Sequence, residues 1–209
     1  PPPPPPPLFQ IRRGKPRLVS DWSSDVCSSD LPVPETAQVL LAAFDSVESA
    51  GHAVAGIISA GILPAGLEMM DSLAIRAAED FAHAGYPDDA AAILLCELDG
   101  TRAEVETRIR EVQELLTGMG ARDVRLAHDD QDRQKFWAGR KAAFPAVGRI
   151  SPDYYCMDGT IPRNHLGKVF STISQWSSEY NLPVANVFHA GDGNLHPLIL
   201  YDANKAGEL

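Results

Sequence analysis

Apolar and polar positions along the chain show two patterns, since short β-rich runs alternate with segments in which apolar residues recur at the helical period. The clearest helical segment is RAEVETRIREVQELLTGMG at 102–120, where apolar residues form one stripe and charged residues cover the remaining surface. The predicted strands are 37–44, 62–71, 89–100, 123–127, 152–159, 184–188 and 197–201, and the predicted helices are 46–61, 72–84, 102–120, 131–144 and 162–180. This order predicts an α+β domain with a mainly antiparallel sheet and helices packed on one face.

Residues 1–31 lack this patterning. Seven prolines open the chain, and the stretch RRGKPRLVSDWSSDVCSSDL that follows has neither a strand period nor a helical period. This stretch resembles the translated read-through of a sequencing adapter, so we expect residues 1–31 to be non-native and disordered. A polyproline II ligand on a polar tether is the alternative. The patterned domain is therefore expected to span residues 32–209.

The composition narrows the class of protein. The formal net charge of −10 disfavours nucleic acid and anionic membranes as partners, because there is no basic patch to release counterions. No apolar run reaches the roughly 18 residues of a spanning helix, and no secretory signal opens the chain, so a cytoplasmic protein is expected. Cys96 and Cys156 lie far apart without CxxC spacing, and we expect both to be buried, reduced thiols.

The segment HAGDGNLHP at 189–197 carries the strongest chemical signal. It places a Gly-rich turn between two β-rich runs, which predicts a hairpin in which Ala190 pairs with Leu195 and His189 stands opposite His196. Directly opposed side chains have Cβ atoms roughly 4.5–5.5 Å apart, so both imidazoles could reach one metal ion. Asp192 and Asn194 are expected to orient the rings as outer-shell partners. The alternative is a pair of histidines that merely caps strand ends.

A second candidate lies in DRQKFWAGRKAAF, where helical spacing places Arg140 beside aromatic surface. Because a guanidinium matches a carboxylate bidentately and stays charged, Arg140 could clamp a substrate carboxylate. The alternative is ordinary packing, with Arg140 in a salt bridge or stacked on Trp137. The spacing alone does not choose between them.

Together with FWAGRKAAFPAVGRISPDYYCMDGTIPR and ILPAGLEMMD, the histidine segment resembles the C-terminal domain of FAD-linked oxidases that act on D-2-hydroxy acids. This family includes flavin subunits of glycolate oxidases as well as D-lactate and D-2-hydroxyglutarate dehydrogenases. The resemblance covers residues 32–209 and implies a ferredoxin-like cap that packs on an FAD-binding domain. It also implies that His189 and His196 ligate a divalent metal (Zn, Mn or Fe), and that Arg140 holds the substrate carboxylate.

The reaction implied by the resemblance is oxidation of a small 2-hydroxy acid to the 2-oxo acid by hydride transfer to FAD. Relatives that handle a second carboxylate carry a polar residue where this chain has Leu198, which favours a monocarboxylic substrate such as glycolate or D-lactate. The resemblance further implies iron–sulfur partner subunits and a peripheral location on the inner membrane face. Residues 32–209 contain neither the FAD-binding domain nor the later Glu-His pair that supplies the family's third metal ligand and candidate base. We therefore expect a partial domain that is inactive alone, with its catalytic base unknown.

Two other classes stay open from the residues alone. A flavin-independent hydrolase or isomerase could use the same metal on the two histidines, although no carboxylate base is obviously placed for it. A non-catalytic ferredoxin-like binding module would make the hairpin purely structural.

Overall fold

The computed structural model describes residues 33–208, so the adapter-like segment predicted at 1–31 lies outside the described residues. The strands are β1 (Thr36–Phe44), β2 (Gly66–Asp71), β3 (Ala92–Gly100), β4 (Ala121–Leu126), β5 (Asp153–Cys156), β6 (Gly159–Thr160), β7 (Val184–Phe188), β8 (Asn194–Leu195) and β9 (Pro197–Tyr201). The helices are α1 (Val47–Ser59), α2 (Ser72–Ala82), α3 (Arg102–Gly118), α4 (Asp130–Val147) and α5 (Leu166–Tyr180), with a short 3₁₀ helix at Arg163–His165.

The first half of the domain has a ferredoxin-like topology. Strands β1 to β4 are arranged in the order β4-β1-β3-β2, and each neighbouring pair is antiparallel. Helix α1 connects β1 to β2 and α3 connects β3 to β4, which gives the split βαβ arrangement, while α2 is added between β2 and β3. The predicted α+β class with a mainly antiparallel sheet is confirmed.

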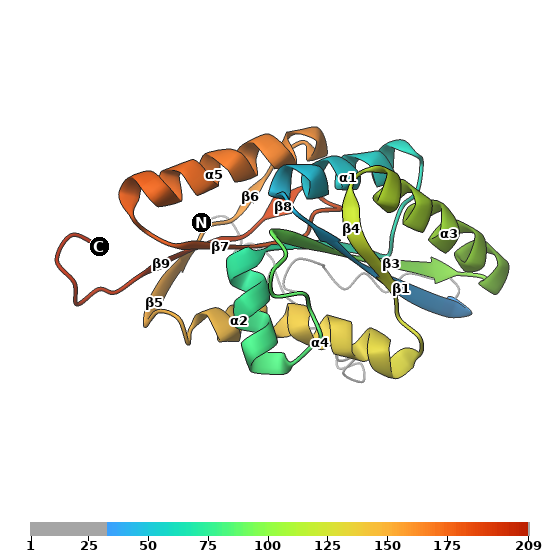
Figure 1. The fold of residues 1–209 in the computed structure, drawn as a ribbon, viewed down its shortest axis with the longest axis horizontal. Helices are drawn as coiled ribbons and strands as arrows, with labels where there is room; N and C mark the ends of the chain where they lie inside the picture. Colours follow the sequence, from blue (N-terminus) through green and yellow to red (C-terminus); the bar gives the residue numbers. More distant parts are fainter. Residues whose placement is uncertain (1–32, 209) are drawn as a thin grey trace, which may run out of the picture. The chain divides into compact units, whose positions relative to one another are not determined.

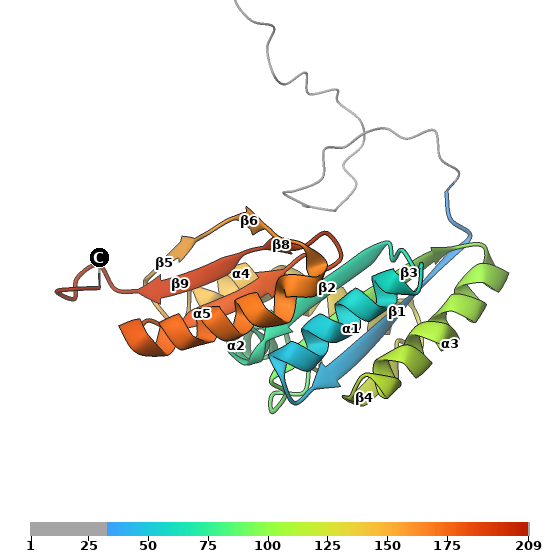
Figure 2. The ribbon, with the colours of Figure 1, turned by 90° about the horizontal axis from the view of Figure 1, so that it is seen from above.

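The second half extends the same sheet. Met69 and Met70 of β2 pair with Phe188 and Val187 of β7, and β9 and β5 follow to complete a seven-stranded order β4-β1-β3-β2-β7-β9-β5. Strands β6 and β8 form a separate two-stranded ladder. Figure 2 shows β7 and β9 running side by side beyond β2. The sheet therefore brings the histidine segment next to a strand from the first half.

Helices cover both faces of the sheet, so the prediction that they pack on one face is wrong. Figure 1 shows α1, α3 and α5 on one side of the sheet and α2 and α4 on the other. Two buried clusters correspond to these layers, and the alternating residues of β1 divide between them: Leu40 belongs to the first cluster and Leu41 to the second. The reason lies in the strand VLLAAF, which is apolar at every position and therefore needs an apolar cover on both faces.

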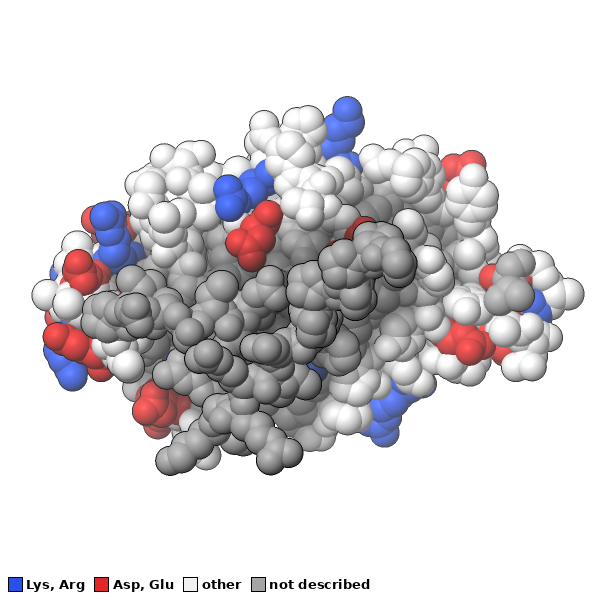
Figure 3. All heavy atoms as spheres, turned by 180° about the vertical axis from the view of Figure 1, so that it is seen from behind, with Lys and Arg blue, Asp and Glu red and all other residues white. Residues whose placement is uncertain are grey.

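The surface of the described part adds two observations. Within residues 33–208, no helix combines the length and the apolar character needed to cross a membrane. On the face drawn in Figure 3, basic and acidic side chains are interspersed. Cys96 is buried, but Cys156 is exposed because it lies on β5 at the edge of the sheet, which corrects the prediction of two buried thiols.

Candidate functional site

Strand parity directs the candidate residues to one face of the sheet. Met70 and Val187 are paired across β2 and β7, and both belong to the cluster beneath α2 and α4. Because side chains alternate between faces, Glu68 shares the face of Met70, and His189 shares that of Val187. Extending the antiparallel register by two residues places Glu68 opposite His189, on the side where α4 packs.

The hairpin register differs from the prediction by two residues. His189 pairs with Asn194 rather than with His196, and its N–H and C=O both bond to Asn194, at 3.0 and 3.1 Å. A two-residue shift leaves each side chain on its original face, whereas a one-residue shift would reverse it. The two imidazoles are therefore still neighbours, with ring centroids 5.2 Å apart and planes nearly perpendicular at 88°.

The turn itself is fastened to the rest of the sheet. Gly193 has φ +72°, and a Cβ at this position would lie 2.2 Å from the carbonyl oxygen of Ile161, so the turn requires glycine here. The N–H of Ile161 bonds to the Gly193 carbonyl at 2.9 Å, and the N–H of Gly191 bonds to the Leu67 carbonyl at 2.9 Å. The Leu67 contact holds the turn against β2, one residue from Glu68, and the Ile161 contact ties it to the segment that follows β6.

The carboxylate of Glu68, which is largely shielded from solvent, joins Arg140 to His189. The Oε2 atom of Glu68 accepts hydrogen bonds from Nε and Nη2 of Arg140 at 3.1 and 2.8 Å, while its Oε1 atom lies 2.9 Å from Nδ1 of His189. The side chains of Arg140 and Glu68 are only 9% and 12% exposed. The structure thus brings the arginine and both histidines together. Of the two packing alternatives for Arg140, it shows the salt bridge, and Glu68 is the partner.

His196 lies in a more apolar part of the site. Its ring packs edge-on against Phe144, with centroids 6.2 Å apart, and its Nδ1 lies 3.5 Å from Oδ1 of the exposed Asp158. Burial is the largest cause that lowers the pKa of His196. The neighbouring His189 and Arg140 lower it further, while Asp158 opposes the shift. A neutral imidazole is the form that coordinates a metal ion.

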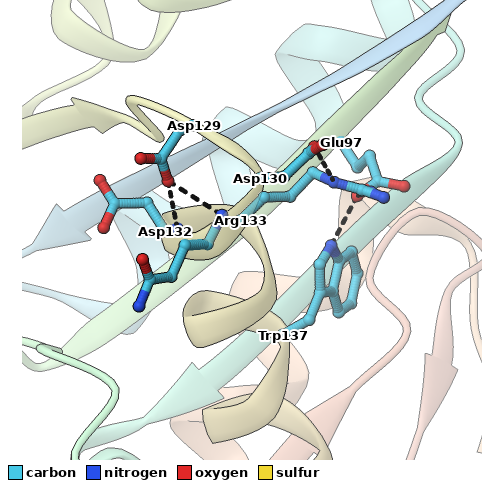
Figure 4. Close-up of polar contacts among 7 residues, drawn as sticks. Glu97, Asp129, Asp130, Asp132, Arg133 and Trp137 are labelled. Carbon is cyan, nitrogen blue, oxygen red and sulfur yellow. Dashed lines mark hydrogen bonds and ion pairs between the residues drawn. The ribbon is translucent and has the colours of Figure 1, made fainter.

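Helix α4 is anchored so that Arg140 reaches the sheet. Figure 4 shows the indole of Trp137 pointing at Glu97 of β3, and its Nε1–H donates to Oε2 at 2.6 Å. Arg133 lies 3.5 Å from the same carboxylate, and Asp129 caps the helix by accepting from two backbone N–H groups at 2.9 Å. The WxxR spacing therefore places two residues, one turn apart on α4, onto two glutamates of neighbouring strands.

Gly139 brings α4 close to its neighbours. A Cβ at this position would lie 2.5 Å from Cβ of Ala84 and 2.6 Å from the ring of Tyr86. The backbone of α4 therefore lies directly against these two side chains. The adjacent Arg140 is also buried.

Two nitrogen ligands suited to a divalent transition metal are present. If Nδ1 of His189 donates to Glu68, its lone pair lies on Nε2, which is the usual arrangement of a metal-binding histidine backed by a carboxylate. The Oδ1 atom of Asn194, on the face of His189, is buried without a hydrogen-bond partner among the described residues, which suits a polar ligand. However, within residues 33–208 no three His, Cys, Asp or Glu side chains are grouped to hold a metal. The donors fit a metal, but a third such ligand is not among them.

The predicted outer-shell roles are distributed differently. Glu68 and Asp158 contact the Nδ1 atoms of the two histidines, whereas Asp192 is exposed in the turn. Sequence reasoning missed Glu68, although one signal was available. In the strand GLEMMD it is a charged residue surrounded by apolar ones, and a charge in a buried strand requires a partner.

The comparisons with known proteins place the chain in a family. Residues 33–209 match the family described as FAD linked oxidases, C-terminal domain. The chain belongs to this family. It is 64% identical over 187 residues to the glycolate oxidase subunit GlcD of Escherichia coli K12, covering 90% of this chain and 38% of that protein. It is 32% identical over 179 residues to GlcD of Bacillus subtilis, covering 86% and 38%, and 28% identical over 181 residues to a probable mitochondrial D-lactate dehydrogenase of Danio rerio, covering 85% and 36%.

Solved structures that share this fold are less similar in sequence than the GlcD relatives. A p-cresol methylhydroxylase with substrate bound superposes with a TM-score of 0.63 at 14% identity, over 85% of this chain and 41% of that one. An alkyldihydroxyacetonephosphate synthase gives 0.57 at 14% identity, over 80% and 36%. At this identity the likeness concerns the fold alone. The chain spans about 38% of the length of the GlcD relatives.

Proposed function

We propose that this domain forms the substrate-binding part of an FAD-dependent enzyme that oxidises a small 2-hydroxy acid, glycolate or D-lactate, to the 2-oxo acid. The observation that carries the proposal is the buried Arg140, held by Glu68 beside two imidazoles, in a chain 64% identical to a glycolate oxidase subunit. The family match favours this reading over a flavin-independent hydrolase and over a non-catalytic binding module.

Arg140 is proposed to bind the substrate carboxylate. A guanidinium has about five N–H donors. Among residues 33–208, two of its N–H groups, on Nε and Nη2, donate to Glu68, and we assign the remaining donors to a planar anion. A charged donor that is almost buried binds a carboxylate more strongly than an exposed one, because the local dielectric constant is low. The substrate would therefore be oriented by its carboxylate end.

His189 and His196 are proposed to hold a divalent metal (Zn, Mn or Fe), with Glu68 and Asp158 at their Nδ1 atoms and Asn194 as a further polar group. When bound, such a metal acts as a Lewis acid that lowers the pKa of the substrate hydroxyl. The neutral state of His196, favoured by its burial, keeps a lone pair available for this purpose. The family resemblance assigns the third ligand and the base to a segment beyond the described residues.

FAD supplies the hydride acceptor when it is bound, and we assign its binding mainly to the part of the parent enzyme that this chain does not span. Leu198 supports a monocarboxylic substrate. It is fully buried in the apolar cluster and pairs with Ala185 and Cys156, so it offers no group to a second carboxylate. Partner subunits, with iron–sulfur centres, and a cytoplasmic position at the inner membrane face are proposed from the family resemblance; GlcD of E. coli is itself named as a subunit.

The test is oxidation by the full-length enzyme that carries this domain. Glycolate and D-lactate should be oxidised, while D-2-hydroxyglutarate should be a poor substrate. Oxidation of the dicarboxylate at an equal rate would contradict the role of Leu198, and failure with all hydroxy acids would contradict the proposal. The 209-residue chain alone should show neither flavin absorbance nor oxidation.

A further inference from the structure

Glu68 contacts both Arg140, the proposed carboxylate clamp, and His189, a proposed metal ligand. It lies on β2, in the ferredoxin-like half, whereas Arg140 lies on α4 and His189 follows β7. Its two oxygens are divided, since Oε2 accepts two hydrogen bonds from Arg140 and Oε1 lies 2.9 Å from His189 Nδ1. With 12% of its side chain exposed, this carboxylate exchanges little with water.

This division of the oxygens argues against a role in proton transfer to substrate. A general base needs an oxygen within reach of the proton that it removes, and both oxygens of Glu68 are already engaged with protein groups. The same contacts are suited to orientation. The carboxylate restrains the guanidinium through two adjacent N–H groups, and it favours the tautomer of His189 with the proton on Nδ1.

We propose that Glu68 is the positioning residue of the site, which orients the Arg140 guanidinium with one oxygen and fixes the His189 tautomer with the other. A single side chain then keeps the proposed carboxylate clamp and the proposed metal ligand in a constant mutual arrangement. The roles of Arg140 and His189 in catalysis rest on the proposed function, but the orientation of the guanidinium and the tautomer of the imidazole can be measured without substrate.

Glu68→Gln is the informative variant because a glutamine has only one acceptor oxygen. That oxygen should turn to the charged Arg140, since charge-assisted hydrogen bonds are the stronger ones. The amide NH₂ then faces His189 and donates to Nδ1, which moves the ring proton to Nε2. The substitution should therefore invert the tautomer of His189 and withdraw the lone pair of Nε2 from metal binding.

Glu97→Gln is the matched control. Glu97 lies on the neighbouring strand β3, is 19% exposed, and holds Trp137 and Arg133 of the same helix (Figure 4). It therefore reproduces the loss of a partly buried carboxylate under α4 without touching either histidine or Arg140.

The experiment uses the 209-residue chain, with imidazole ¹⁵N spectra for the tautomer and Zn²⁺ alone as the titrant. We expect Nδ1–H on His189 in the unsubstituted chain and in Glu97→Gln, and Nε2–H in Glu68→Gln. The Kd for Zn²⁺ should rise about 10–100-fold in Glu68→Gln only, the usual range for an outer-shell change. An unchanged tautomer and Kd in Glu68→Gln, or equal changes in Glu97→Gln, would overturn the proposal.

Two outcomes separate this inference from the proposed function. If Glu68→Gln does not fold, the unsubstituted spectrum decides, because a proton on Nε2 of His189 contradicts the role of Glu68. If the unsubstituted chain shows Nδ1–H but binds no Zn²⁺, the two histidines do not hold the metal by themselves, while the positioning of the ring by Glu68 is supported.

Discussion

His189 and His196 lie with their ring centroids 5.2 Å apart although they are not paired across the hairpin, where His189 faces Asn194. They are diagonal neighbours on one face, at a separation that long side chains bridge. Their proximity follows from a shared face and a tight turn, and each ring has a different carboxylate at its Nδ1 atom. The two imidazoles are thus close neighbours, each with its own carboxylate partner.

Removal of either imidazole should abolish metal binding. His189→Ala and His196→Ala should each raise the Kd for Zn²⁺ by more than about 100-fold, beyond the effect of an outer-shell change, because a direct ligand is lost. Calorimetric titration of the chain measures this effect. His52→Ala, on the exposed face of α1, is the control and should bind as the unsubstituted chain does. Equal affinity in all three variants would show that the histidines are not the ligands.

Arg140→Lys should impair substrate use more than stability. Lysine keeps the positive charge beside Glu68, but it lacks the planar fork that matches a carboxylate. In the full-length enzyme kcat/KM should fall about 10–100-fold, the equivalent of about 1.5–3 kcal/mol for a charged hydrogen bond. Arg108→Lys, in an exposed pair with Glu111 on α3, should leave kcat/KM unchanged. An Arg140→Lys enzyme with full activity would remove the arginine from substrate binding.

Gly139→Ala should destabilise the domain. The added methyl group would clash with Ala84 and Tyr86, and overpacking of this kind costs about 1–3 kcal/mol. The better helix propensity of alanine returns at most about 1 kcal/mol. Gly118→Ala in α3 meets nothing within 4 Å and should raise the stability slightly. Urea unfolding of both variants tests the pair, and an equal gain in both would show that α4 does not pack closely at Gly139.

Asp71 should make stability depend on pH. Burial raises its pKa from 3.8 to about 6, against hydrogen bonds from Ala74 and Asn186 that lower it. Because the folded state binds the proton more tightly than the unfolded state, this group should increase stability as pH falls from about 6 to 4. The gain is on the order of 3 kcal/mol, since one pKa unit corresponds to about 1.4 kcal/mol.

Unfolding free energies measured across this pH range should show that dependence in the unsubstituted chain and a flatter profile in Asp71→Asn. The exposed Asp88→Asn should retain it. A flat profile in the unsubstituted chain would contradict the raised pKa.

Much of the fold could be predicted because its signals are local. The stripe of helix α3 and its Thr101–Glu104 capping box depend on residues a few positions apart, and the predicted 102–120 agrees with Arg102–Gly118. The covering of the second face was missed because the helices that cover it, α2 and α4, are brought there by tertiary packing. The apolar run of β1, read for both of its faces, was the available sign.

The site could be predicted in part. The spacing indicated that His189 and His196 would be neighbours, and it left two roles open for Arg140, whereas the register of the hairpin depends on where the turn closes and was wrong by two residues. Glu68 was missed because its partners are distant in sequence, with Arg140 72 positions and His189 121 positions further along the chain. The pairing of β2 with β7 brings His189 to Glu68, and the packing of α4 on the sheet brings Arg140 to it.

The most direct test of the central claim is anaerobic reduction of the flavin in the full-length enzyme by glycolate and by D-lactate. We predict rapid loss of the oxidised flavin absorbance with at least one of them, and a much slower loss in the Arg140→Lys and His189→Ala enzymes. A flavin that neither acid reduces, or that is reduced equally fast in both variants, would contradict the assignment of this site to 2-hydroxy-acid oxidation.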